Sequence, residues 1–545
     1  MPTSKLSLTV AAALLGVISH ANYFIRGEHH TTGWRILKLA ALGSISVVAA
    51  LVYFPKFSVR DAIGVVLTGL SLFSSGLFAS MLMYRAFFHP LRHIPGPFNA
   101  RLTKLWFGFN SASGKGYQKL KELHEIYGDV VRVGPNEVSI IIPKALELVH
   151  GPGSMCQKGG WYDVNLPRTS LHQMRDRKLH DRRRKSGWDK AFNSKSVKGY
   201  EKRVTKHTDK LLAYLSDQSG NPVDASKISL WYTWDIMGML AFSRSFNNIE
   251  SGKSHPLLDL MHTELKPLAF LSPIPWLAYL LNRLPPSLSP VNAFFVYCAS
   301  CVKERRSIEP PEPDIYTYLL EGEKFFGKPD LDEALMEGDA RLIVVAGSDT
   351  TASALATTIY HFARNPNIVE SLRRELASHN LCSPADLLPD MLKALPYLNA
   401  IIDETLRIRP PVLGSVYRET PPEGLQVDDT YIPGAVTVLT PMYAIQTSPK
   451  AYVDPLEYVP ERWTTQPELV LNKAAWFPFL LGPYGCIGKQ VALMELRISI
   501  AKLVLAFDIQ FAPGEDGTAF MTDTMDCFTQ VLAPIEIIFA ERKAQ

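Results

Sequence analysis

One cysteine of this chain lies in a setting that favours metal-ligand chemistry. Cys486 is surrounded by Gly482, Gly485 and Gly488, and an apolar helical pattern begins directly after it, at Lys489. Glycines allow positive φ angles and let a backbone approach a ligand closely. The free N–H groups and partial positive charge of a helix N-terminus favour a thiolate over a thiol. Such a thiolate is a good axial ligand for haem iron; the alternative is a buried core cysteine beside a glycine turn.

The ten-residue segment that contains this cysteine resembles the haem-binding loop of the cytochrome P450 superfamily, the haem-thiolate monooxygenases. The family pattern is Phe-x-x-Gly-x-Arg-x-Cys-x-Gly, and the chain matches it at Phe479, Gly482, Cys486 and Gly488. The resemblance implies that this segment binds haem b and that the sulfur of Cys486 is the axial ligand of its iron.

The chain departs from the pattern at Tyr484, where the family usually has an arginine that binds a haem propionate. A tyrosine hydroxyl can donate one hydrogen bond but brings no positive charge. In the family a helix upstream supplies cations to the propionates, which assigns this role to His180 and Arg184, four residues apart on one helical face. Arg418 is a further candidate, and together these cations would compensate for Tyr484. The spacing to Phe192 is irregular by about one residue, and the alternative is a solvated basic face or a membrane-contacting patch.

A second segment breaks the helical preference of its surroundings. The sequence Ala-Gly-Ser-Asp-Thr-Thr, which starts at Ala346, lies inside a helical pattern over 331–362, although glycine and threonine are poor helix formers. It resembles the distal helix of the same family. By that resemblance Thr350 hydrogen-bonds the bound dioxygen, Asp349 helps to deliver protons, and Ala346 and Gly347 leave room for oxygen and substrate. The alternative is a buried helix with small residues for close packing.

Three further charged residues match a structural motif of the family. Glu404 and Arg407 are three residues apart on a predicted helix, and Arg462 belongs to the segment Pro460–Trp463. Taken alone, Glu404 and Arg407 would form an exposed ion pair of little energetic weight. By the resemblance, Glu404, Arg407 and Arg462 form a buried triad that holds the shape of the haem site. Loss of one member should leave a buried unpaired charge and abolish haem incorporation.

The elements that position these residues are mainly helices with small β-sheets, in one large domain over 91–545. Hydrophobic periodicity predicts helices at 116–127, 200–216, 228–243, 332–364, 366–377, 391–407 and 488–506. It predicts short strands at 130–133, 138–142, 436–439 and 535–539, and proline-rich breaks at 273–290 and 309–313. Cys298 and Cys301 form a C-x-x-C pair without redox context, so we expect two cysteines on one helix.

The first 90 residues predict a membrane anchor. Apolar runs near 6–25, 37–54 and 62–84 are candidates for transmembrane helices, which need about 20 residues. A cleaved signal peptide is the alternative for the first run. Basic residues follow the first and third runs, which favours a lumenal N-terminus and a cytosolic catalytic domain on the endoplasmic reticulum membrane.

Composition excludes several classes of protein. The net charge of +4 is too small for a nucleic-acid binder that acts through bulk charge, and six cysteines in 545 residues exclude a disulfide scaffold. The sequence has no Walker loop, no dinucleotide-binding glycine motif after a strand and no H-E-x-x-H. We therefore expect electrons from a partner, which by the resemblance is an NADPH-cytochrome P450 reductase on the same membrane.

These parts together predict a monooxygenase that inserts one atom of O2 into a lipophilic small molecule. By resemblance, substrate contacts come from 155–175, 342–346, 411–416 and 525–531. The multiple apolar runs and Tyr484 resemble a fungal branch, which suggests secondary metabolism of a terpenoid or similar scaffold. The alternatives are a housekeeping sterol or fatty-acid hydroxylase, a haem-thiolate isomerase or dehydratase that needs no O2, and a non-catalytic haem carrier.

Overall fold

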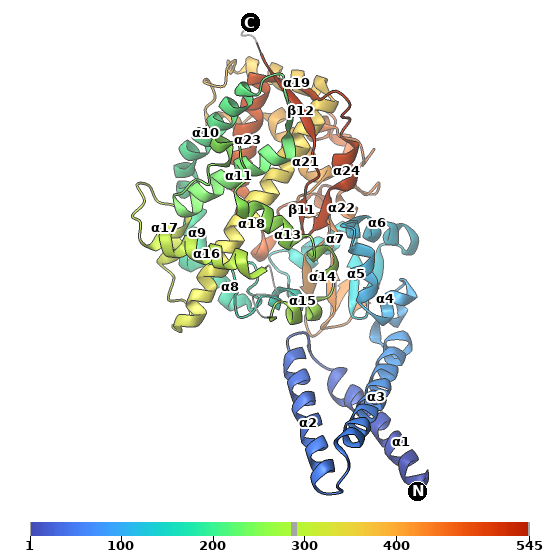
Figure 1. Cartoon of the computed structure of the whole chain (residues 1–545). Helices are drawn as coiled ribbons and strands as arrows, with labels where there is room; N and C mark the ends of the chain where they lie inside the picture. The colour runs from blue at the N-terminus through green and yellow to red at the C-terminus, as the bar shows by residue number, and fades with distance from the viewer. Residues whose placement is uncertain (1, 285–290, 543–545) are drawn as a thin grey trace.

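The molecule consists of a helical globular unit, which we call the catalytic unit after its predicted role, and a three-helix anchor that projects from one end of it (Figure 1). The computed structural model describes residues 2–284 and 291–542. The catalytic unit is mainly α-helical with small sheets, as the sequence predicts.

The helices of the catalytic unit follow the predicted segments with additional short helices between them. In chain order they are α4 (Phe98–Leu102), α5 (Leu105–Ser111), α6 (Gly116–Tyr127), α7 (Pro143–His150), α8 (Arg177–Arg183), α9 (Asp189–Ala191), α10 (Ser194–Asp217), α11 (Ala225–Phe242), α12 (Asn248–Ser251), α13 (Pro256–Leu265), α14 (Leu268–Leu271), α15 (Pro275–Leu281), α16 (Val291–Arg306), α17 (Ile315–Leu320), α18 (Pro329–Arg364), α19 (Pro366–Ser378), α20 (Pro389–Leu392), α21 (Pro396–Ile408), α22 (Met442–Gln446), α23 (Lys489–Ala506) and α24 (Thr518–Asp523).

The strands form four small sheets. They are β1 (Val130–Gly134), β2 (Glu137–Ile140), β3 (Gln157–Lys158), β4 (Pro222–Asp224), β5 (Tyr417–Glu419), β6 (Leu425–Val427), β7 (Thr430–Ile432), β8 (Thr437–Leu439), β9 (Phe507–Phe511), β10 (Met525–Cys527), β11 (Thr529–Val531) and β12 (Glu536–Glu541). The largest sheet has the order β1-β2-β8-β5-β3, and another has the order β4-β12-β9. The pairs β6–β7 and β10–β11 form hairpins.

Two sequence predictions need correction at prolines. The predicted helix 391–407 is two helices, because α21 begins at Pro396. The predicted break 273–290 contains α15, which begins at Pro275. Proline lacks an N–H that the first helical position does not need, so it can start a helix as readily as it ends one. Residues 285–290 of that predicted break lie outside the described residues.

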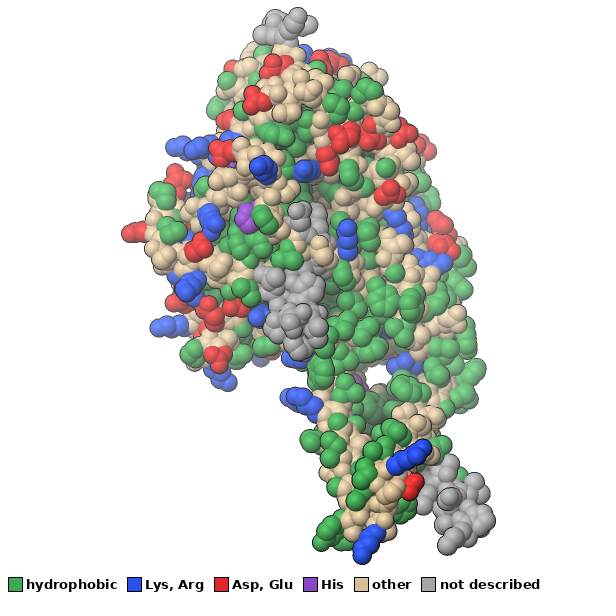
Figure 2. Space-filling view, viewed as in Figure 1, with side chains coloured by type: hydrophobic (Ala, Val, Ile, Leu, Met, Phe, Trp, Pro, Cys, Tyr) green, Lys and Arg blue, Asp and Glu red, His purple; other side chains and the backbone are tan. Residues whose placement is uncertain are grey.

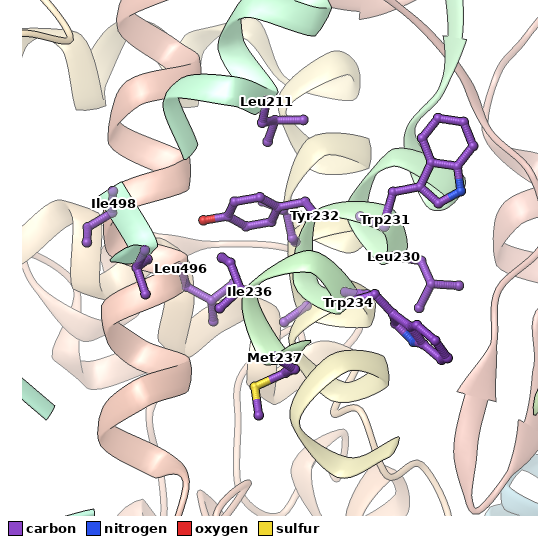
Figure 3. Close-up of a cluster of buried hydrophobic side chains, with 14 of the residues drawn as sticks. Leu211, Leu230, Trp231, Tyr232, Trp234, Ile236, Met237, Leu496 and Ile498 are labelled. Atoms are coloured by element: carbon purple, nitrogen blue, oxygen red, sulfur yellow. The ribbon is translucent and has the colours of Figure 1, made fainter. Parts of the chain in front are cut away.

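The core surrounds α11, which is buried along nearly its whole length and shares one hydrophobic cluster with α18 and α23. Figure 3 shows Tyr232 and Ile236 of α11 directed towards the side of α23 that carries Leu496. Complete burial of one such large apolar side chain contributes about 1.5–3 kcal/mol. This packing fixes α18, which carries the predicted distal motif, against α23, which follows the predicted haem loop. Cys298 and Cys301 lie buried on α16 in the same core.

The anchor contains α1 (Pro2–Ser19), α2 (Gly33–Tyr53) and α3 (Val59–Met83). Helix α2 and the helical stretch Val59–Phe88 are long and apolar enough to cross a membrane, whereas α1 contributes the shorter apolar stretch Val10–Phe24. A third crossing therefore stays a prediction. Helix α18 is also long and apolar, but it is mostly buried inside the catalytic unit, so it is a core helix.

Close approach of two backbones holds α1 against α3. A Cβ at Gly16 would collide with the carbonyl of Phe73, and a Cβ at Gly76 would collide with the carbonyl of Ala13. Small residues at matched positions are the usual way for two membrane helices to pack closely.

The loop between α1 and α2 contacts the catalytic unit. Glu28 pairs with Arg175 at 2.8 Å, and the His30 ring nitrogen lies 2.9 Å from a carboxylate oxygen of Asp163. Trp34 donates its indole N–H to the carbonyl of residue 280 at 3.1 Å. The catalytic unit and this loop thus lie at the same end of the anchor, while the turn between α2 and α3 lies at the other end (Figure 1).

Candidate active site

A cavity inside the catalytic unit brings the predicted haem loop and the predicted distal helix together. Its lining includes Cys486 and Tyr484 from the loop and Ala346 and Thr350 from α18. Most of the surface of the cavity is apolar, and its polar groups include several basic side chains. An apolar cavity with a few convergent polar groups is the usual form of a small-molecule site.

The loop before α23 turns tightly to present its cysteine. Gly482 has φ +60°, and a Cβ there would collide with the backbone of His150 and Gly151. The Cys486 N–H donates to the carbonyl of Phe479 at 2.8 Å, which closes the turn. Gly488 is the N-cap of α23. The Cys486 sulfur is exposed to the cavity although it lies deep in the protein.

Two opposing influences act on the Cys486 thiol. Burial is the larger influence and raises the pKa of the thiol, while the backbone N–H groups of Gly488 and Lys489 and the cations of Lys489 and Arg184 oppose this rise. The groups that stabilise a thiolate are therefore in place, and coordination to a metal ion deprotonates a thiol outright.

His180 and Arg184 both line the cavity, as the sequence predicts for haem contacts. Arg184 begins a π-helical turn, Arg184–Trp188, that directly follows α8. A π turn adds one residue to a helical turn, which explains the irregular spacing to Phe192.

Neither residue offers a free positive charge to the cavity: Arg184 is paired with a carboxylate, and His180 is neutral. Arg184 pairs with Asp189 at 2.8 Å and donates to the carbonyl of Pro483 at 3.3 Å. Burial, followed by the nearby ammonium of Lys158, lowers the pKa of His180 to about 4, so its imidazole is neutral at physiological pH.

Arg418 lines the cavity beside a second cation that the sequence did not single out, Lys158. Both side chains are buried, and the structure gives neither an acidic partner among the described residues. Arg418 donates to the Tyr162 hydroxyl at 2.9 Å, but its Nε has no partner. The signal for Lys158 was absent from the sequence, because the two-residue strand β3 becomes visible only through its pairing with β5.

The donor set around the cavity fits haem b. A sulfur that faces the cavity matches an iron ion, and buried cations without acids match carboxylates. Burying a charge without a partner is costly, so this arrangement points to an anionic group that completes the site. The residues present, Cys486 and the buried cations, therefore fit an iron porphyrin with two propionates.

On α18, the distal residues divide between two faces. The Thr350 hydroxyl lines the cavity and donates to the carbonyl of Ala346 at 2.7 Å. Gly347 also lines the cavity, but a Cβ there would press into Met237 at 2.6 Å, so this glycine also permits close packing of α18 on α11.

Asp349 faces away from the cavity lining and is buried. One of its oxygens accepts from the Thr529 hydroxyl at 3.0 Å, and the other has no partner among the described residues. Burial raises the pKa of Asp349 to about 7, and the Thr529 hydrogen bond opposes that rise. The sequence analysis did not identify Thr529, because it lies 180 residues from Asp349.

The structure brings Glu404, Arg407 and Arg462 together, with all three side chains fully buried. The Glu404 carboxylate accepts two hydrogen bonds from Arg407 at 2.8 Å and one from Arg462 at 3.0 Å. It also accepts from the Val459 N–H at 2.9 Å and the Trp463 indole at 3.0 Å. The charge of this carboxylate is thus satisfied within the chain.

The predicted substrate segments reach the cavity to different extents. The segments 155–175, 342–346 and 411–416 each contribute several lining residues, whereas 525–531 contributes only Phe528. Lining residues outside these segments, which the sequence analysis missed, include Phe192, Met237 and Met442.

Comparison with known proteins identifies the family. The cytochrome P450 family model matches residues 94–538. The chain is 38% identical to tryprostatin B 6-hydroxylase of Aspergillus fumigatus, over 99% of this chain and 97% of the relative. It is 38% identical to the cytochrome P450 monooxygenase notG' of Aspergillus versicolor and 35% identical to the cytochrome P450 monooxygenase lcsK of Purpureocillium lilacinum, each over 99% of both chains. The chain therefore belongs to the cytochrome P450 family, among its fungal monooxygenases.

Proposed function

We propose that this P450 inserts one oxygen atom from O2 into a lipophilic small molecule in secondary metabolism. The observation that carries the proposal is the single cavity lined by Cys486, Thr350 and apolar side chains from several elements. Electrons come from NADPH-cytochrome P450 reductase, since the sequence contains no nicotinamide or flavin motif.

Bound haem would supply the activation of dioxygen, with electron donation from the Cys486 thiolate favouring O–O cleavage. The chain's own residues supply position and protons. Leu342, Val416 and Phe528 line the cavity and hold an apolar substrate while they exclude water. The Thr350 hydroxyl donates to the Ala346 carbonyl, which fixes its direction, and we assign proton delivery in the cavity to this hydroxyl.

Asp349 supplies protons to the cavity side of α18. A carboxyl with a pKa of about 7 can both accept and release a proton at neutral pH. Thr529 holds this carboxyl on the far side of the helix in the structure. The relay therefore requires the carboxyl to leave Thr529, or a water chain to connect it to Thr350.

The substrate reaches the enzyme from the membrane of the endoplasmic reticulum. Large apolar side chains are exposed on elements at the anchor end of the catalytic unit, with Phe98 on α4, Phe109 on α5 and Trp276 on α15. Figure 2 shows a broad apolar area on the part of the catalytic unit next to the anchor. The α1–α2 loop lies on the same side of the anchor as the catalytic unit. If the catalytic unit is cytosolic, this loop and its Arg26 are cytosolic too, which agrees with the preference of basic loop residues for that side.

The named activity of one relative guides the choice of test substrates. Tryprostatin B 6-hydroxylase carries a hydroxylation in its name, and we propose hydroxylation here too. The terpenoid class stays a prediction from the sequence, because an apolar lining selects for lipophilic character and not for one scaffold.

The experiment is expression with a reductase in yeast microsomes and incubation with a panel of lipophilic compounds under ¹⁸O2. The expected product is heavier by one labelled oxygen atom and forms only when NADPH is present. Microsomes with Cys486→Ala are the matched control and should give no product. Turnover without NADPH, or a product without label from O2, would instead establish an isomerase or dehydratase.

A further inference from the structure

The position of Tyr484 leaves the haem loop without the cation that the family pattern provides. Haem b carries two propionates, so a neutral site needs about two cations near them. The two upstream candidates supply little charge, because Arg184 is paired with Asp189 and His180 is neutral at physiological pH. Arg418 provides one cation, and the second must come from elsewhere.

Lys158 lies directly opposite Arg418 in the β3–β5 pair. Like charges at opposite positions of two strands normally repel and destabilise a sheet. Lys158 and Arg418 are nevertheless 3% and 1% exposed. The Lys158 ammonium donates to the carbonyl of Leu171 at 3.1 Å, and no carboxylate of the described residues pairs with either cation. Burying two like charges side by side is costly, and an anion between or beside them would remove that cost.

The Tyr484 ring lies at the centre of these cations. The Lys158 ammonium is 4.7 Å from the ring centroid, and the guanidinium carbons of Arg418 and Arg177 are 4.9 and 5.4 Å away. The face of an aromatic ring attracts cations, so the ring positions them without adding charge. The Tyr484 hydroxyl is buried and has no hydrogen-bond partner among the described residues. Arg177 shares its charge with Asp181 at 2.9 Å, so of these three cations around the ring Lys158 and Arg418 are the ones that no carboxylate of the described residues compensates.

We propose that Lys158 replaces the missing arginine of the haem loop: Lys158 and Arg418 bind the haem propionates, and the Tyr484 ring holds the two cations in place. The cation of this subsite has thus moved from the haem loop to strand β3. The inference rests on the proposed haem site but not on any substrate or on oxygen insertion.

The experiment measures haem release from purified full-length holoenzyme to excess apomyoglobin, followed by the Soret absorbance. Lys158→Met should release haem roughly ten- to hundredfold faster than the wild type, because a hydrogen bond to a charged group is lost. Lys158→Arg keeps the charge and should release haem at close to the wild-type rate. Lys178→Met is the matched control: Lys178 is exposed on α8 and does not line the cavity.

The decisive variant is the double substitution Lys158→Met with Tyr484→Arg. It restores a cation to the loop, so haem release should return to within about threefold of the wild-type rate. Tyr484→Arg alone should not slow release, since both propionates already have a cation and the variant loses the ring that positions Lys158 and Arg418. A merely structural role for Lys158 gives no such rescue.

Several results would overturn the inference. One is equal haem release from Lys158→Met and Lys178→Met, and another is a double variant that loses haem as fast as Lys158→Met. If Lys158→Met yields no holoprotein, the same test applies to the yield: recovery in the double variant supports the inference, and no recovery overturns it. Normal haem retention with weaker spectral binding of acidic substrates would assign Lys158 to the substrate instead. Because the assay follows haem alone, failure of oxygen insertion does not affect its outcome.

Discussion

Two clusters of buried charge lie beside the haem loop, and they are built in opposite ways. In the first, the Glu404 carboxylate accepts hydrogen bonds from Arg407, Arg462 and neighbouring N–H groups, so every group finds its partner within the chain. In the second, Lys158 and Arg418 face each other across two strands without an acid. Both clusters are equally removed from solvent.

The difference shows how burial and pairing together separate structural from ligand-binding charges. A fully paired cluster stabilises only the fold around it, because it has no capacity left for a ligand. An unpaired cluster costs free energy until a partner arrives. The pKa of Lys158 reflects this, since burial and then Arg418 lower it well below its usual value.

The largest expected effect comes from removing the Cys486 sulfur. This sulfur would hold the haem, whose propionates are the proposed anionic partners of Lys158 and Arg418. Cys486→Ala should abolish the haem signature and all activity, while far-UV circular dichroism still shows a folded helical protein. The measurement is the carbon monoxide difference spectrum of the reduced protein. Cys382→Ser changes an exposed cysteine and should leave the spectrum unchanged. A thiolate-type spectrum in Cys486→Ala would refute the assignment of the iron ligand.

Breaking the first cluster should have the next largest effect. Glu404→Gln leaves two buried guanidinium groups without a carboxylate and should destabilise the protein by about 3–5 kcal/mol, with loss of holoprotein. The matched control is Glu370→Gln, which removes an exposed carboxylate from another i,i+3 pair with arginine. It should cost less than about 1 kcal/mol. Equal effects in chemical denaturation would mean that the buried triad has no special role.

A substitution outside both clusters should leave haem binding and the fold intact but lower the coupling of NADPH consumption to product formation. Thr350→Ala removes a cavity hydroxyl without changing any ion pair. We expect normal haem content and a roughly tenfold lower ratio of product formed to NADPH consumed, which corresponds to the loss of one hydrogen bond. Peroxide release and NADPH consumption measure this ratio. Normal coupling would contradict the assignment of Thr350 to the relay.

The two clusters should respond with opposite sign when haem is absent. In the Cys486→Ala background, Lys158→Met removes a buried cation that has no acidic partner among the described residues and should stabilise the chain by about 1 kcal/mol. Arg407→Met in the same background should destabilise it, because Glu404 loses its bidentate partner. Thermal or denaturant unfolding gives both values. Destabilisation by Lys158→Met would mean that its charge is already compensated within the chain.

The smallest effect concerns the buried carboxyl of Asp349 on α18. Thr529→Val removes a hydrogen bond that lowers the pKa of Asp349, so the pKa rises above about 7. A raised carboxyl pKa keeps the proton bound to higher pH, and the alkaline fall in coupling should therefore shift upward. Because the folded state holds this proton between the ordinary aspartate pKa and about 7, the contribution of Asp349 to stability declines as pH rises through that window. Thr529→Ser retains the hydroxyl and should leave the pH profile of coupling unchanged.

Much of the fold and part of the site could be predicted from the sequence. The predicted helices 332–364 and 488–506 agree with α18 and α23 within a few residues. Their hydrophobic patterns are local and strong. Local patterns mispredicted the helix boundaries at Pro396 and Pro275, where a proline starts a helix. Whether a proline starts or ends a helix depends on how the chain folds around it, which the local pattern does not contain.

By itself the sequence determined the cysteine loop, the distal helix and the membership of Glu404, Arg407 and Arg462 in known motifs, because each is a contiguous segment with its own residue pattern. Only the tertiary structure decided which charges are neutralised. Lys158 meets Arg418 across 260 residues of chain, and Asp349 meets Thr529 across 180. Neutralisation depends on which groups lie within hydrogen-bond distance in a low-dielectric interior, and packing of distant segments alone sets that distance.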